Sequence, residues 1–198
     1  MKANAVLLIT TALLSPLTWA DSYWNAEKPV RESVEVAQHY QFASDVAVDG
    51  ATILVRDYRN RVIDVTVTTK ALVPDTAYSI WIAAFNRPWA CATPYACGLG
   101  DLGNERVKAS VFWGGGLISD AFGYGGTQLK LAPGQTEREL FTGGDYGLAN
   151  MRAEVHVVLR SHGPTGVAGP VAEQLGTANA ACPPAGCSND FASIHSIR

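Results

Sequence analysis

The chain has 198 residues, a formal net charge of −3 and 47% hydrophobic residues. A weakly acidic chain of mixed charge lacks the basic patch that nucleic-acid binding requires, so nucleic acid is not an expected partner. The length is sufficient for one domain with a sizeable hydrophobic core.

Residues 1–20 are expected to be a secretory signal peptide. Lys2 precedes an apolar run, and Ala20 supplies the small residue that a cleavage site requires. The run is too short to cross a bilayer, and no later stretch reaches the ~18–20 uninterrupted apolar residues of a membrane helix. The protein is therefore predicted to be exported, either to the periplasm or outside the cell, without a membrane span.

Short β-rich runs follow a polar lead-in, residues 21–32. Residues 51–56 and 62–69 flank a turn-like segment at 57–60, and the second run alternates apolar and polar side chains, which predicts a hairpin. Residues 77–85 are apolar on both faces and predict a central strand that is covered on both sides. The order of these elements is typical of an all-β protein.

The second half of the chain continues the β pattern. Residues 107–113 and 127–131 are strand-like, and the three glycines at 114–116 predict a loop tip between them. Residues 152–164 predict a further strand. No convincing amphipathic helix is present. The sequence predicts a Greek-key-type antiparallel β-sandwich over residues 33–179 with a disulfide-containing loop, followed by a Cys/Pro-rich C-terminal tail of low structural content, residues 180–198.

The four cysteines form two pairs that are close in sequence, Cys91 with Cys97 and Cys182 with Cys187. In an exported chain, an even number of cysteines indicates disulfides. We expect two local bridges; the alternative is a crossed pairing, which would tie the tail to the middle of the chain. A four-thiolate zinc site is not favoured, because the spacings differ from those of C-x2-C knuckles.

Residues 100–104, Gly-Asp-Leu-Gly-Asn, resemble the G-D-L-G-N motif of copper–zinc superoxide dismutases, whose aspartate is a zinc ligand. The later Val155-His156 is similar to the strand that carries the fourth copper histidine of that family. The resemblance, over residues 72–187, implies a β-sandwich. The H-x-H of the family's copper strand and its zinc-loop histidines are absent here, so dismutase activity does not follow. Residues 162–171 also resemble a turn of CHRD-type (chordin-like) extracellular β-domains, H-G-x-x-G-x-x-G-P-V.

The strand at 152–164 carries candidate metal ligands. Glu154 and His156 share one face, His162 follows, and Asp101 and His39 are further possible ligands. Nitrogen and carboxylate ligands of this kind suit copper or zinc. The alternatives are an exposed strand face that makes cross-strand polar pairs, and acid–base catalysis by the same residues.

Three aromatic residues, Trp89, Trp113 and Tyr124, are candidates for a ligand-binding surface, with core filling as the alternative. No nucleophile elbow and no carboxylate pair is evident, so no catalytic residue is assigned. The sequence favours a non-catalytic extracytoplasmic binding or structural module over an enzyme, without a cofactor and with a protein, glycan or small ligand as its partner. The alternative is a copper- or zinc-binding protein, in the form of a degenerate superoxide dismutase-like enzyme.

Overall fold

The computed structural model describes residues 32–44, 46–134, 139–142 and 146–197, which belong to one compact unit, residues 31–198. The predicted signal peptide and all but the last residue of the predicted lead-in lie outside the described residues. The strands are β1 (Glu32–Gln41), β2 (Ala47–Asp57), β3 (Val62–Thr69), β4 (Thr76–Phe85), β5 (Ala109–Ile118), β6 (Gly125–Leu131), β7 (Glu139–Thr142), β8 (Glu154–Pro164) and β9 (Ser188–His195). The helical turns are η1 (Pro88–Ala90), η2 (Leu99–Asp101) and α1 (Val171–Gly176). The all-β prediction is confirmed.

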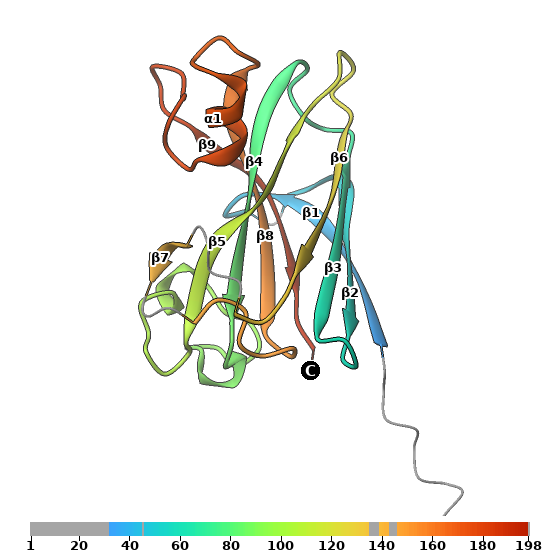
Figure 1. Cartoon of the computed structure of the whole chain (residues 1–198), viewed down its shortest axis with the longest axis vertical. Coiled ribbons are helices and arrows are strands. Elements are labelled where there is room, and N and C mark those ends of the chain that lie inside the picture. The colour runs from blue at the N-terminus through green and yellow to red at the C-terminus, as the bar shows by residue number, and fades with distance from the viewer. Residues whose placement is uncertain (1–31, 45, 135–138, 143–145, 198) are drawn as a thin grey trace, which may run out of the picture. The chain divides into compact units, whose positions relative to one another are not determined.

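The described strands pair antiparallel in one sheet of order β6-β3-β2-β1-β9-β8-β4-β5-β7. β1 joins β9 through two residue pairs, Tyr40 with Ala192 and Gln41 with Phe191. On either side of this β1–β9 junction, the two halves of the sheet face each other across a shared core, as a sandwich requires (Figure 1). β5 and β6, which belong to opposite halves, also contact each other.

The predicted hairpin is β2 and β3. The Asp57 carboxylate accepts hydrogen bonds from the backbone N–H groups of Arg59 and Asn60, both at 2.9 Å, which fixes the turn. Alternation then turns the apolar side chains of β3 inward, where Ile63 and Val67 are fully buried. The local sequence signal and the structure agree here.

β4 is buried along its whole length, as its two apolar faces predict. Its inner face, with Tyr78 and Ile82, belongs to the main core. Its outer face carries Ala83 and Phe85, which pack in a second cluster with the Cys91–Cys97 disulfide. The long excursion between β4 and β5 therefore covers the outer face of the sheet at this point.

The three glycines at 114–116 do not form the predicted loop tip, because β5 runs through them to Ile118. A Cβ on Gly114 would lie 2.8 Å from Cγ1 of Ile82, and one on Gly116 would lie 2.8 Å from Cβ of Leu175 in α1. Glycine is required here for close packing against β4 and α1, a role that the sequence does not distinguish from turn formation.

The predicted C-terminal tail, residues 180–198, is also corrected. Residues 188–195 form β9, which lies between β1 and β8 in the middle of the sheet. The inward positions of β9 are Phe191, Ser193 and His195. Because two of these three are polar, the apolar alternation that reveals a strand is missing from the sequence.

Both local disulfides are confirmed, with Cα–Cα distances of 5.3 Å for Cys91–Cys97 and 5.0 Å for Cys182–Cys187. Disulfides are typical of proteins from oxidising, extracytoplasmic compartments. Among the described residues, none of the helices has the length and apolar character needed to cross a membrane.

Candidate functional site

Glu154 and His156, two of the candidate metal ligands, contact each other at the start of β8. The His156 Nε2 and Glu154 Oε1 atoms are 2.8 Å apart, and the same Oε1 accepts the backbone N–H of Cys97 at 2.7 Å. The interpretation of an exposed strand face is wrong at Glu154, which is fully buried. The Cys91–Cys97 loop covers this face, and the Glu154 carboxylate anchors that loop to β8.

Asp101, the candidate ligand from the G-D-L-G-N motif, also binds the Cys91–Cys97 loop. Its two carboxylate oxygens accept the backbone N–H groups of Ala92 at 2.8 Å and of Gly98 at 2.9 Å, residues that follow the two half-cystines. Asp101 is itself buried. The carboxylate thus closes the ends of the loop in the way that an Asx cap closes a turn.

His162 lies elsewhere on β8. It is six residues beyond His156, a separation of about 20 Å at ~3.3 Å per residue. Its neighbours are Ser79 of β4 and the C-terminal region at Ala180 and Cys187. The structure therefore brings Glu154 and His156 together and places His162 at a separate position.

The three candidate aromatic residues lie in three different places. Trp89 is half-exposed on η1, in a hollow that it shares with Tyr95 and Arg152. Trp113, on β5, is part-buried, and its indole N–H donates to the carbonyl oxygen of Leu175 at 2.7 Å. Tyr124 is half-exposed and lines a groove on the opposite half of the sheet.

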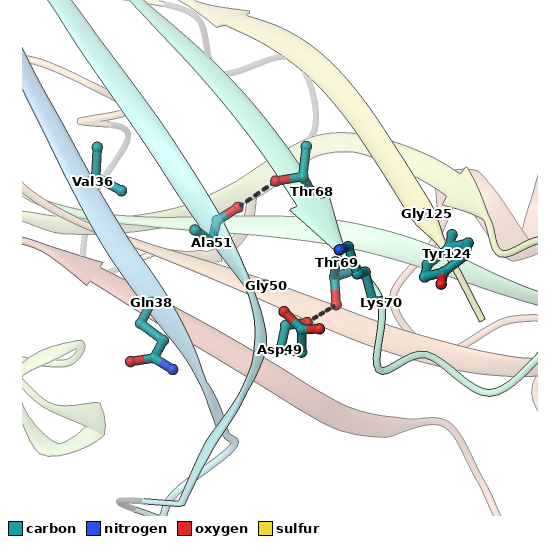
Figure 2. Close-up of a pocket in the computed structure, with 10 residues that line it drawn as sticks. All are labelled: Val36, Gln38, Asp49, Gly50, Ala51, Thr68, Thr69, Lys70, Tyr124 and Gly125. Carbon is teal, nitrogen blue, oxygen red and sulfur yellow. Dashed lines mark hydrogen bonds between the residues drawn. The ribbon is translucent and has the colours of Figure 1, made fainter. Parts of the chain in front are cut away.

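This groove, called the Tyr124 groove below, has a volume of about 680 Å³ and crosses the outer face of β1, β2 and β3 (Figure 2). The lining residues are Val36, Gln38, Asp49, Gly50, Ala51, Thr68, Thr69, Lys70, Tyr124 and Gly125. The volume lies within the ~300–1,000 Å³ that is usual for small-molecule sites.

The floor of the groove contains a β-bulge in β2. The pairing with β1 steps from Gln38–Ala51 to His39–Val48, so that Asp49 and Gly50 have no partner in β1. Gly50 has a φ of +153°, and a Cβ there would lie 2.7 Å from Nδ1 of the buried His39. The floor therefore requires glycine at this position, and bulges of this kind are frequent beside binding and active sites.

Tyr124 forms the wall of the groove and is held in place by the turn between β5 and β6. The Asp120 carboxylate accepts the N–H groups of Phe122 at 2.8 Å and of Tyr124 at 2.9 Å. Lys70 Nζ lies 6.0 Å from the centroid of the Tyr124 ring, and the Phe122 ring lies 6.4 Å from it. The turn thus fixes the backbone that carries the ring, and the ring offers an apolar surface next to a positive charge.

A second hollow, of about 220 Å³, lies on the outer face of β4, β5 and β8. Trp81, Val111 and Val158 give it an apolar floor. Arg160 lies at one end, where its guanidinium donates to Oδ1 of Asn189 at 2.7 Å. The volume is below the usual range for a ligand site, so this hollow accepts at most a small apolar group.

Two histidines near the β1–β9 junction are buried: His39, a candidate metal ligand, and His195, which was not predicted to belong to a site. His39 Nε2 and Thr52 Oγ1 are 3.0 Å apart, whereas His39 Nδ1 and both ring nitrogens of His195 have no hydrogen-bond partner in the described part of the chain. Burial lowers the pKa of His39 to about 4, and burial together with the charges of Arg56, His156 and His39 lowers the pKa of His195 to about 4.

In comparisons with known proteins, no family model, no curated protein and no solved structure matches the chain.

Proposed function

We propose that the chain is an exported, non-catalytic binding module whose ligand site is the Tyr124 groove. The observation that carries the proposal is a half-exposed tyrosine ring, whose backbone is held by the Asp120 turn, next to a concave floor of mixed polar and apolar groups. The two disulfides support an extracytoplasmic location, as does the signal peptide that the sequence predicts.

The chemistry of the groove supports a carbohydrate ligand. Within one concave surface, the Gln38 amide can donate and accept hydrogen bonds, the Thr68 hydroxyl, which donates to the carbonyl oxygen of Ala51, can accept one, and the aromatic face of Tyr124 offers an apolar surface. A sugar ring presents the matching combination, with hydroxyl groups at its edge and C–H groups on its face. Asp49 and Lys70 carry opposite charges, which favours an uncharged glycan over a polyanion.

The arrangement of the residues favours binding over catalysis. Glycoside hydrolysis generally requires two carboxylates, and Asp49 is the one acidic residue among those that line the groove. Ser79 and His162 form a serine–histidine pair with Oγ and Nε2 2.8 Å apart, but both side chains are fully buried. A substrate in solvent does not reach that serine, so the pair is not a hydrolase nucleophile and its base.

Affinity electrophoresis tests this proposal, with soluble neutral α-glucans and β-glucans in the gel and an acidic polysaccharide as the charge control. We expect at least one neutral glycan to retard the wild-type protein and Tyr124→Ala to weaken that binding about tenfold, because the variant loses the aromatic surface. Trp89→Ala is the matched control: it removes another half-exposed aromatic side chain, outside the groove, and should bind like the wild type. Unchanged binding by Tyr124→Ala, or no retardation by any of the glycans, would contradict the proposal.

A further inference from the structure

His162 lies beside the second disulfide and is completely buried. Its Nδ1 atom is 3.1 Å from Sγ of Cys187 and 3.1 Å from the carbonyl oxygen of Ala180. On the other side of the ring, Nε2 is 2.8 Å from Oγ of Ser79. The imidazole therefore links β4 to the loop closed by Cys182 and Cys187.

The hydrogen-bond partners determine the tautomer of His162. A carbonyl oxygen only accepts, so the contact with Ala180 places the imidazole hydrogen on Nδ1. Nε2 then accepts from the Ser79 hydroxyl, which in turn accepts the indole N–H of Trp81 at 2.9 Å. In the disulfide form, the Nδ1 lone pair is consequently not available to a metal ion.

Three potential ligand atoms converge at this point. His162 Nδ1 and the Sγ atoms of Cys182 and Cys187 all lie within 4.8 Å of one another. Tetrahedral zinc with two thiolates and one imidazole requires ligand atoms about 3.6–3.8 Å apart, as follows from bond lengths of ~2.3 Å for sulfur and ~2.0–2.1 Å for nitrogen. In the disulfide the two sulfur atoms are bonded to each other, so reduction must let them separate to this spacing, whereas His162 Nδ1 already lies 3.1 Å from Sγ of Cys187.

We propose that reduction of the Cys182–Cys187 disulfide creates a binding site for a zinc-type divalent cation, with His162 Nδ1 and the two thiolates as its ligands. This inference goes beyond the proposed glycan site and does not depend on it. A dithiol reductant supplies two electrons and two protons, becomes a cyclic disulfide, and leaves two cysteine thiols. Binding of the cation then displaces one proton from each thiol, so the ion and its two thiolates together carry no net charge.

The residues around His162 suit a metal ligand. When Nδ1 binds the cation, the imidazole hydrogen moves to Nε2, and the Ser79 hydroxyl oxygen is in place to accept it. An acceptor hydrogen-bonded to the ring nitrogen that does not bind the metal orients most metal-binding histidines. The loop around the two cysteines is partly exposed, so water can occupy the fourth position.

The exposure of the two disulfides makes the reduction selective. Cys182 and Cys187 are partly exposed, whereas Cys91 and Cys97 are each only 5% exposed. The buried pair is also enclosed by a loop that Asp101 and Glu154 bind through its backbone N–H groups. A reductant in solution should therefore attack the second disulfide first.

Cobalt binding to the full-length exported protein tests the proposal. The protein is reduced with dithiothreitol and desalted without oxygen, and alkylation with mass spectrometry identifies the reduced cysteines. Co²⁺ is then titrated while the thiolate-to-cobalt charge-transfer band is recorded. We expect one Co²⁺ per chain after reduction of Cys182 and Cys187, displacement of Co²⁺ by Zn²⁺, and no such band from the oxidised protein.

Variants separate the roles of the histidine and the thiols. His162→Gln should bind Co²⁺ at least tenfold more weakly, and Ser79→Ala should bind several-fold more weakly while keeping the thiolate band. The matched control His156→Gln removes the other β8 histidine and should bind like the wild type. Equal affinity in His162→Gln and the wild type would overturn the proposal.

X-ray absorption on the zinc-loaded wild-type protein tests the same ligands without any variant. Two sulfur atoms and an imidazole nitrogen are expected around zinc. A shell of four sulfur atoms, or no binding when Cys182 and Cys187 are verified as reduced, would overturn the proposal.

Discussion

Acid should destabilise this protein in part through His39 and His195. Both are buried, and their pKa is lowered to about 4 from an ordinary value of 6.5. Three positively charged or protonatable groups on separate strands act on His195: Arg56 on β2, His156 on β8 and His39 on β1. Below about pH 6.5, these two histidines bind protons in the unfolded chain but stay neutral in the folded chain until the pH approaches 4.

The sign and the size of the effect follow from proton linkage. Because the folded pKa is lower than the unfolded pKa, stability is fully present above about pH 6.5, declines as the pH falls, and levels off below about pH 4. At about pH 5.0, each histidine should cost about 2 kcal/mol relative to pH 7.5, and the two together about 4 kcal/mol. Domains of this size are typically stable by about 5–15 kcal/mol, so the loss is a large fraction of the total.

Urea denaturation of the oxidised protein between pH 7.5 and 5.0 measures this loss, with His195→Gln as the comparison. The variant keeps a neutral polar side chain without the titration, so its free energy of unfolding should fall by about 2 kcal/mol less than that of the wild type over this range. Parallel curves for the two proteins would refute the assignment to His195, because the acid sensitivity would then come from other groups.

Two further substitutions test the packing described above. Arg56→Ala should lower the free energy of unfolding by about 3–5 kcal/mol, measured by urea denaturation at pH 7.5. The variant leaves the Glu35 carboxylate without its partner at 2.6 Å and the Met151 carbonyl oxygen without a donor. A loss below about 1 kcal/mol would contradict this reasoning. Gly116→Ala should cost about 1–3 kcal/mol and displace α1, since the new Cβ would lie 2.8 Å from Cβ of Leu175. Thermal unfolding measures that loss, and a melting temperature equal to that of the wild type would show that α1 moves away without cost.

The elements that could be predicted are those whose signal is local. The β2–β3 hairpin follows from the Asp57 turn and the alternation in residues 62–69, and β4 follows from its two apolar faces. Local pairing of the cysteines could also be predicted, because the loops that they close are short. In each case the residues that determine the structure are neighbours in the chain.

The rest depends on contacts between distant segments. Glu154 was expected on an exposed face because nothing in its own strand shows that the Cys91–Cys97 loop covers it. Gly116 lies within a strand because α1 packs against it, and α1 itself was not predicted. β9 could not be predicted from the sequence because inward positions such as His195 are polar, so its residues show no apolar alternation.

The Tyr124 groove could be predicted only at its tyrosine. Tyr124 is recognisable as an aromatic residue in a glycine-rich segment. Gln38, Asp49 and Thr68 come from three different strands, so no local pattern groups them with it. Their proximity depends on the register of β1, β2 and β3 and on the bulge at Gly50. Register is a property of the pairing between strands, which a single sequence does not display.

The position of β9 has a consequence for the order in which the protein folds. β9 follows the other eight strands in the chain, yet in the sheet it joins β1 to β8. Neither half can dock on the other through this junction until residues 188–195 have been synthesised. Because long-range pairing of this kind is slow, we expect the nascent chain to stay incompletely folded until synthesis has passed residue 195.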